Sequence, residues 1–114
     1  MQEITTRGTM DLSKLSTALE TLGSLAPGNF PVHHAQVLLY IAKKGSCTYR
    51  DIETAFDVTN ASASRIVHTL SETVRHRETC LGLVEIYIDP EEGRRYRVRL
   101  TKKGKAKIRS LEGI

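Results

Sequence analysis

The sequence predicts an α+β fold in which about four helices precede a C-terminal two-stranded β-hairpin and a short final helix. Apolar residues recur at helical spacing through residues 12–70, and two alternating runs over 82–101 then flank a Gly-containing turn. The alternation breaks at Thr101, and a short helix over 102–112 is expected after it. At 114 residues and 39% hydrophobic content, the chain has the size of about one domain, so we expect a single domain over 1–114.

The first helix is predicted over 11–25. Leu12, Leu15, Leu19 and Leu22 follow 3, 4, 3 spacing on one helical stripe, and Asp11 is a natural cap. The stripe is too short for an independent coiled coil, which needs roughly three heptads. It therefore packs on its own domain or on a second subunit. Both remain open, with the subunit contact and hence a homodimer favoured.

A helical core is predicted over 31–81, and its first helix, about 31–44, ends before Gly45. Its broad apolar face is formed by Ala35, Leu38, Leu39, Ile41 and Ala42. Two neighbouring histidines, His33 and His34, stand at its start. Adjacent helical positions point in different directions, so they cannot jointly bind a metal and are interpreted as exposed or capping residues.

A helix-turn-helix pattern follows. Thr48 and Asp51 have the spacing of a helix cap, and a short helix with its inner face at Ile52, Ala55 and Phe56 ends in a turn at Asp57 and Val58. Thr59 or Asn60 then caps another helix, whose apolar stripe is Ala63, Ile66, Val67 and Leu70.

The second helix of such a pair lies in the major groove of DNA, with its N-terminal residues toward the bases. Small hydroxyls allow close approach, and Arg65 has the fork that suits guanine or phosphate. Ordinary solvent exposure is the alternative for each residue. The predicted DNA contacts of this helix are Thr59, Asn60, Ser62, Ser64, Arg65 and His68.

The hairpin and final helix concentrate positive charge. Residues 94–109 hold nine Lys or Arg and no Asp or Glu, whereas residues 1–30 sum to −1 and residues 31–60 to zero. A clustered basic stripe is typical of proteins that meet a phosphate backbone, although a solvated face is the alternative. Double-stranded DNA is the expected partner, and Arg94, Arg95 and Arg97 are the predicted hairpin contacts.

The order of these pieces resembles MarR-type winged-helix transcription regulators over about residues 35–108. The pieces are FDVTNASASRIVHTL, GLV at 82–84, the hairpin tip DPEEGRRYRV and LTKKG at 100–104. The resemblance implies a winged helix-turn-helix that binds double-stranded DNA, with the 82–101 hairpin as the wing.

This sequence departs from the family pattern at three places. Asp57 stands where the turn commonly has Gly, and the longer connection SETVRHRETCL could prolong the recognition helix by two turns through Val74 and Leu81. The chain also stops at Ile114, before the C-terminal helices that such regulators use to dimerise and to frame a ligand pocket. This argues against dimerisation by that route and against a small-molecule effector.

Other functional classes find little support. Gly-rich phosphate loops, HExxH and GxSxG are absent from the sequence, so we expect no enzyme and no cofactor. His76 and Cys80 lie four apart but leave a zinc site at least one ligand short, so no metal is expected. The alternative function is a winged-helix subunit of a phage or plasmid replication or packaging assembly, or a protein-interaction winged helix with weak DNA affinity.

Composition also suggests where the protein works. No apolar run approaches the roughly 18 residues that span a bilayer, and no secretory signal is visible, so a cytoplasmic protein without membrane contact is expected. Cys47 and Cys80 lack CxxC spacing and are interpreted as free packing thiols, with a redox switch as the alternative.

Overall fold

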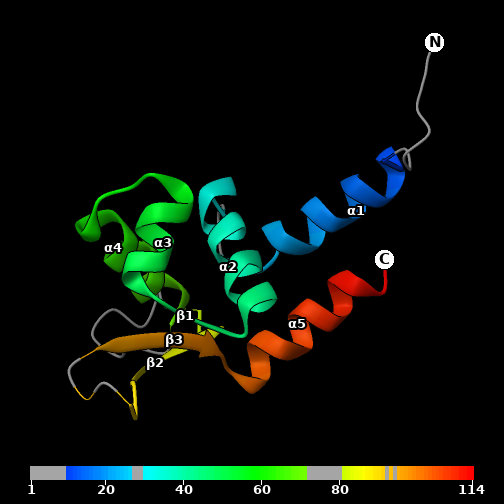
Figure 1. Ribbon diagram of the computed structural model, residues 1–114. Helices are drawn as coiled ribbons and strands as arrows, with labels where there is room; N and C mark the ends of the chain where they lie inside the picture. Colours follow the sequence, from blue (N-terminus) through cyan, green and yellow to red (C-terminus); the bar gives the residue numbers. More distant parts are fainter. Residues whose placement is uncertain (1–9, 27–29, 72–80, 92, 94) are drawn as a thin grey trace.

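The computed structural model describes residues 10–26, 30–71, 81–91, 93 and 95–114, which form five helices and a small sheet (Figure 1). This confirms the predicted α+β class. The elements run in the order α1 (Leu12–Gly23), α2 (Val32–Lys44), β1 (Ser46–Thr48), α3 (Tyr49–Phe56), α4 (Asn60–Leu70), β2 (Val84–Ile88), β3 (Tyr96–Leu100) and α5 (Lys102–Glu112).

The sheet has three antiparallel strands in the order β1-β3-β2. The β2–β3 hairpin was expected, and its register pairs Val84 with Leu100 and Ile88 with Tyr96. Strand β1 was not expected. It has only three residues, and Cys47 pairs with Val98 on a strand about fifty positions later, so no local alternation announces it.

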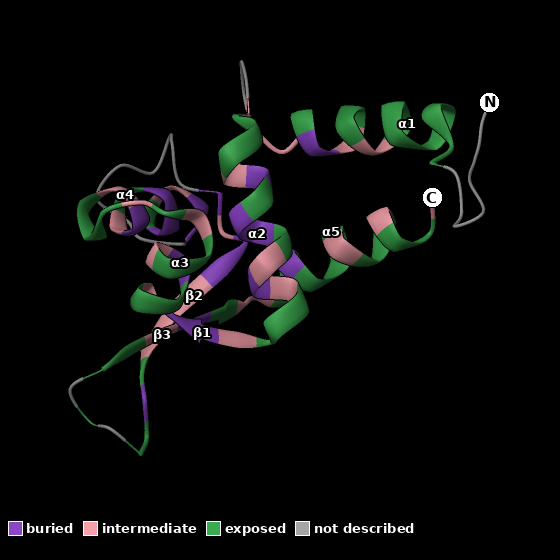
Figure 2. Cartoon of the chain, turned by 45° about the horizontal axis from the view of Figure 1, so that its top comes forward, coloured by how far each residue is buried: buried purple, intermediate pink, exposed green. Residues whose placement is uncertain are grey.

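The hydrophobic core lies where α2, α3 and α4 pack against the inner face of this sheet (Figure 2). The four predicted apolar positions of α4 are all buried, which confirms that stripe. Side chains of the core include Val37, Leu38, Ile41, Cys47, Ile52, Ala63, Ile66, Val67, Leu70, Leu83, Val84 and Val98.

Three positions of the predicted helix faces differ. Leu39 and Ala55 are exposed and Ala42 is only half-buried, whereas Val37 is fully buried. Helix α2 packs on α4 and also on β1 and β3, so its buried arc is turned toward Val37. The short α3 buries Ile52 alone, and Ala55 lies on its solvent side.

Helix starts follow the local signals of the sequence. Asp11 caps α1 by accepting hydrogen bonds from the N–H groups of Ser13 and Lys14. Thr48 and Asp51 form a complete capping box at α3, with bonds of 2.9 and 3.1 Å. Such caps satisfy helix N–H groups that have no partner within the helix.

Helix α1 extends away from the core on the same side of the molecule as α5 (Figures 1 and 2). Leu12, Leu15 and Leu19 are 74%, 38% and 52% exposed, and only Leu22, at 7%, is buried. Most of the leucine stripe is therefore uncovered by this chain. Within the described segments, no helix has the length and apolar character needed to cross a membrane.

Helix α5 is attached to the sheet at its first turn. Thr101 caps the helix by accepting from the Gly104 N–H, and its hydroxyl donates to the Gly82 carbonyl at 2.7 Å. A Cβ on Gly104 would lie 2.0 Å from the Leu83 carbonyl oxygen. The Leu-Thr-x-x-Gly spacing thus has a structural cause, because only glycine allows this approach.

Candidate nucleic-acid interface

The α3–α4 turn is built on a left-handed residue. Asp57 ends α3 with φ 53° and ψ 51°, a conformation that Asp tolerates better than most residues. Thr59 then caps α4 by accepting from the Ser62 N–H at 3.1 Å. The Asn60 amide donates to Glu53 at 2.8 Å and ties α4 to α3. The predicted turn and the cap at Thr59 are confirmed.

The face of α4 opposite its buried stripe carries the predicted contact residues. Asn60, Arg65 and His68 are exposed, and Ser62 and Ser64 are half-buried. His68 Nδ1 lies 2.7 Å from the Ser64 carbonyl oxygen and 3.3 Å from its hydroxyl, so these two residues are held together.

The exposed polar residues of this face are spread over the three turns of α4. Thr59 is exposed, but its hydroxyl already serves as the helix cap. The structure therefore brings the side chains of Asn60, Arg65 and His68 to solvent along one side of α4.

Helix α4 is shorter than the sequence suggested. Helix α4 ends at Leu70, and Ser71 is extended, with φ −89° and ψ −178°. Ser71 instead bridges to Val84, and the Leu83 N–H donates to the Leu70 carbonyl at 2.7 Å. The predicted prolongation by two turns is wrong at Ser71, while Val74 lies outside the described residues. The end of α4 is thereby joined to the start of the wing.

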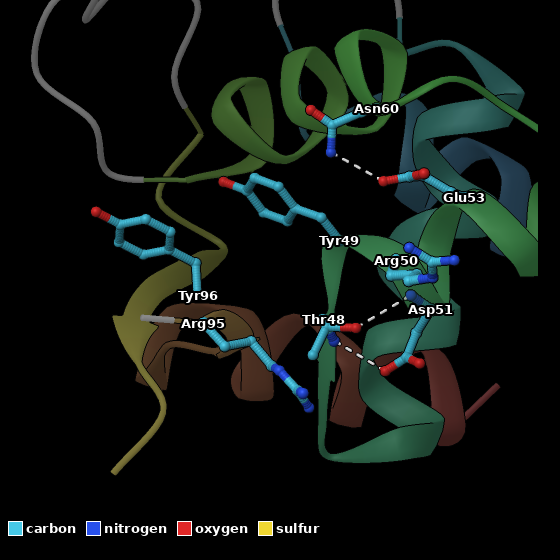
Figure 3. A pocket seen from close by; sticks show the side chains of 8 residues that line it. All are labelled: Thr48, Tyr49, Arg50, Asp51, Glu53, Asn60, Arg95 and Tyr96. Atoms are coloured by element: carbon cyan, nitrogen blue, oxygen red, sulfur yellow. Dashed lines mark hydrogen bonds between the residues drawn. The ribbon is translucent and has the colours of Figure 1, made fainter. Parts of the chain in front are cut away.

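The predicted wing arginines have different surroundings. Arg94 lies outside the described residues. Arg95 is exposed and lines a cleft of about 420 Å³ between α3 and the tip end of the wing, together with Tyr96 and Asn60 (Figure 3). This cleft brings a predicted wing contact and a predicted α4 contact to one place.

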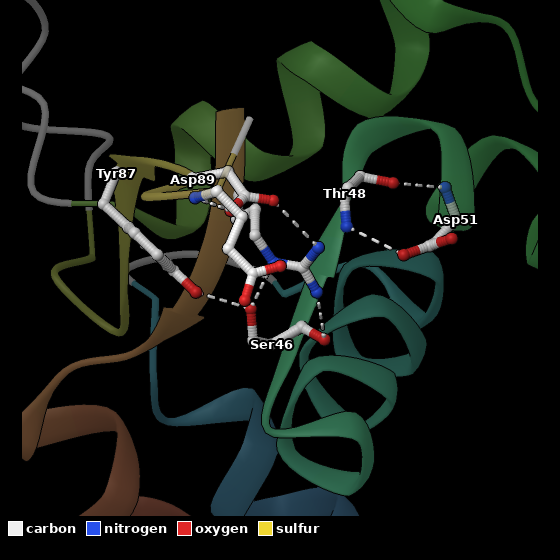
Figure 4. Close-up of polar contacts among 7 residues, drawn as sticks. Ser46, Thr48, Asp51, Tyr87 and Asp89 are labelled. Carbon is white, nitrogen blue, oxygen red and sulfur yellow. Dashed lines mark hydrogen bonds and ion pairs between the residues drawn. The ribbon is translucent and has the colours of Figure 1, made fainter. Parts of the chain in front are cut away.

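Arg97 lies apart from these residues, on the outer face of the sheet. Its Nε donates to the Ser46 hydroxyl at 2.8 Å, and its Nη1 lies 3.5 Å from Asp89 Oδ2. Ser46 also shares a 2.6 Å hydrogen bond with the Tyr87 hydroxyl (Figure 4). The guanidinium thus joins β1 to both strands of the wing. Desolvation lowers the pKa of Arg97, but the side-chain hydrogen bond with Tyr87 and the charges of Tyr87, Asp89 and Asp51 together outweigh it, so the pKa stands above its usual value.

The basic stretch 94–109 does not form one surface. Lys102, Lys105 and Arg109 belong to α5, which extends from the opposite end of the sheet from the wing tip and away from α4 (Figures 1 and 2). The expected single stripe is therefore divided, because β3 carries the chain from the tip to the far end of the wing. The cations of α5 do not stand beside α4.

Cys47 is buried in the core, and this burial, with a smaller effect of Asp51, raises the pKa of its thiol to about 11. A protonated, buried thiol reacts poorly with oxidants. His76 and Cys80 lie outside the described residues. Among the residues that the structure describes, no three His, Cys, Asp or Glu side chains gather as metal ligands.

Sequence reasoning missed four residues of the cleft: Tyr49, Arg50, Glu53 and Tyr96. Tyr49 and Arg50 form the first turn of α3, and Tyr96 begins β3. They come together because β1, directly before α3, pairs with β3. Because β1 leaves no local signal in the sequence, the sequence also gives no sign that these residues lie together.

A helix-turn-helix followed by a hairpin within a three-stranded sheet defines a winged-helix protein. No family model matches the chain. A curated relative, the HTH-type transcriptional regulator BilQ of Clostridioides difficile (strain CD3), is 27% identical over 77 residues. The match covers 68% of this chain and 47% of that protein, so the chain spans about half the length of this relative.

Solved structures share the fold at low identity. A mutant of MepR from S. aureus, bound to an oligodeoxyribonucleotide, has a TM-score of 0.66 and 20% identity over 90% of this chain and 67% of that one. A mutant of MarR from E. coli, in complex with operator DNA, has a TM-score of 0.60 and 19% identity, over 90% of this chain and 68% of that one. A MarR-like regulator from Thermotoga maritima has a TM-score of 0.63 and 24% identity, over 92% of this chain and 75% of that one. The chain therefore has the MarR-type winged-helix fold, as its motifs suggested.

Proposed function

We propose that this protein is a sequence-specific transcription regulator that binds double-stranded DNA. The observation that carries the proposal is the recognition helix, because α4 buries one complete stripe and exposes Asn60, Arg65 and His68 on its other side. Two solved neighbours of the same fold are DNA complexes, which supports this role. The role requires no cofactor, metal ion or catalytic residue.

In this proposal, α4 enters the major groove and the wing follows the backbone or the minor groove. Asn60, Arg65 and His68 reach base edges, while Thr59, which caps the helix, approaches the backbone together with Ser62 and Ser64. Arg94 and Arg95 meet phosphates or the minor groove. Arg97 supports them by holding the wing against β1 rather than by contacting DNA.

The proposed regulator acts as a two-fold dimer that reads two half-sites about one helical turn apart. The exposed leucines of α1 supply an apolar face that a second copy would cover. Leu15→Asp together with Leu19→Asp should yield folded monomers in sedimentation experiments, since neither side chain belongs to the core. A monomeric unmodified protein at micromolar concentration would remove the dimer from the proposal.

Selection of bound sequences from random duplexes tests the function directly. A regulator returns a short motif, palindromic if the protein is a dimer, whereas an assembly or protein-interaction module returns none. Log affinity should fall with log salt at a slope of about −3 per protomer, because about three cations beside α4 and the wing tip reach phosphates. A flat salt dependence, or no binding at low salt, contradicts the proposal.

A further inference from the structure

The side chain of Glu53 on α3 holds the first residue of α4. Asn60 Nδ2 donates a hydrogen bond to Glu53 Oε2 at 2.8 Å, and both side chains line the cleft beside the wing (Figure 3). We propose that Glu53 positions the Asn60 amide so that α4 reads an adenine in the major groove. The inference rests on the proposed function and deepens it, because it assigns a base to Asn60 and a positioning role to Glu53.

Glu53 is fixed at the centre of the turn between α3 and α4. Its backbone carbonyl accepts hydrogen bonds from the N–H groups of Asp57 and Val58, the latter at 3.2 Å. Its side chain is half-buried and reaches Asn60, seven positions later in the chain. Because the same residue closes the turn and contacts α4, its carboxylate stands at a set place relative to the start of that helix.

The hydrogen bond decides which end of the amide faces the carboxylate. An ionised carboxylate only accepts hydrogen bonds, so the amide nitrogen of Asn60 must face Glu53 and the carbonyl oxygen must face elsewhere. Among the residues that the structure describes, the Asn60 side chain makes no other hydrogen bond. The carbonyl oxygen and the second N–H hydrogen are therefore left for a partner outside this chain.

One acceptor beside one donor is the pattern that adenine matches. Asn60 is exposed as the first residue of α4, and the N-terminal residues of a recognition helix are those that approach base edges. In the major groove adenine presents the N6 amino group as donor and N7 as acceptor, whereas guanine presents two acceptors. The Asn60 carbonyl oxygen would accept from N6, and the remaining N–H would donate to N7. An amide without Glu53 could turn over and offer its nitrogen to guanine, so the contact with Glu53 adds to the discrimination.

The test measures base discrimination, the ratio of affinities for two duplexes that differ only at the contacted base pair. This ratio does not depend on the fraction of folded protein. The base pair is located as the position of the selected motif at which Asn60→Ala loses selectivity. There, Asn60→Ala should lower discrimination for adenine over guanine about tenfold, and Glu53→Ala should lower it about fivefold. The double variant should lose only as much as Asn60→Ala alone, because Glu53 acts through Asn60.

The loss of charge is controlled at the same turn. Glu53→Ala also removes a negative charge beside the DNA, which should strengthen binding to every duplex. Asp57→Asn removes a negative charge four residues later, and asparagine tolerates the left-handed conformation of that position. It should strengthen binding to all sequences alike and leave base discrimination as it is.

An altered base tests the contact from the side of the DNA. An adenine analogue with carbon in place of N7 cannot accept the second hydrogen bond. A duplex with this analogue at the contacted position should bind the unmodified protein more weakly than the adenine duplex does. The Asn60→Ala protein should bind both duplexes equally.

The outcomes separate the proposed function from the inference. If the unmodified protein binds no duplex at low salt, the proposed function fails and the inference fails with it. If it binds a selected motif but Asn60→Ala weakens all sequences alike, or relaxes a position other than an adenine, the adenine contact is overturned. If discrimination survives in Glu53→Ala, or falls equally in Asp57→Asn, the positioning role of Glu53 is overturned.

Discussion

Replacing Gly104 with alanine tests how the final helix is attached to the wing. The new Cβ would lie 2.0 Å from the Leu83 carbonyl oxygen, 3.0 Å from its carbon and 3.2 Å from Leu100 Cδ2. Because two of these atoms belong to the backbone, no side-chain rotation relieves the contact, and α5 must move outward by about 1 Å to reach an ordinary separation. That movement also strains the 2.7 Å hydrogen bond from Thr101 to the Gly82 carbonyl.

The expected cost follows from opposing effects. Overpacking against backbone costs about 3 kcal/mol, and the better helix propensity of alanine returns about 1 kcal/mol. Gly104→Ala should therefore lower the free energy of unfolding by about 2 kcal/mol in urea denaturation. Ala106→Gly, at an exposed position of the same helix, is the control and should cost only about 1 kcal/mol. A Gly104→Ala protein as stable as the unmodified one would refute the reasoning.

Four further changes test other parts of the molecule. Asp57→Gly should stabilise the protein by about 0.5 kcal/mol in the same assay, since Asp57 is left-handed, and a loss of stability would contradict this. In a Cys80→Ser background, Cys47 should react with thiol reagents at neutral pH only after unfolding, because burial raises the pKa of its thiol to about 11; rapid reaction of folded protein would contradict its burial. Burial, with His33 nearby, lowers the pKa of His34 below its usual 6.5, so stability is full above that pH and falls below it, and His34→Gln should flatten this part of the pH profile of unfolding. Arg65→Ala should cost about 1–3 kcal/mol on the preferred site and relax discrimination at one base pair, and unchanged discrimination would mean that α4 is not the reader.

The features that were predictable from the sequence are those with local causes. Asp11, Thr48 and Thr59 cap helices within three residues of themselves, so their spacing alone marks the helix starts. The apolar stripe of α4 repeats within a single helix in the same way. The Leu-Thr-x-x-Gly motif was visible as a pattern, but its cause, the approach of Gly104 to Leu83, needed the structure.

The features that were missed depend on contacts distant in the chain. Arg97 is one of several similar arginines in the sequence, and only the pairing of β1 with β3 brings Ser46 within 2.8 Å of it. Arg50 stands alone among acidic neighbours and joins Arg95 through the same pairing. The division of the basic stretch has a different cause. A run of cations in the sequence does not show that β3 will place its first residues at the wing tip and its last residues, with α5, at the opposite end of the sheet.

The pairing of β1 with β3 has a mechanical consequence. Thr48 is both the last residue of β1 and the cap of α3, so one residue connects the edge of the sheet to the helix-turn-helix. The hydrogen bonds of Arg97 and Ser46 stiffen the same junction. The helix-turn-helix and the wing are therefore held at a fixed distance from each other. In the proposed complex, a duplex whose grooves do not match this distance must bend or narrow a groove. We therefore expect this protein to favour deformable base steps between its contacts, at positions that no side chain touches.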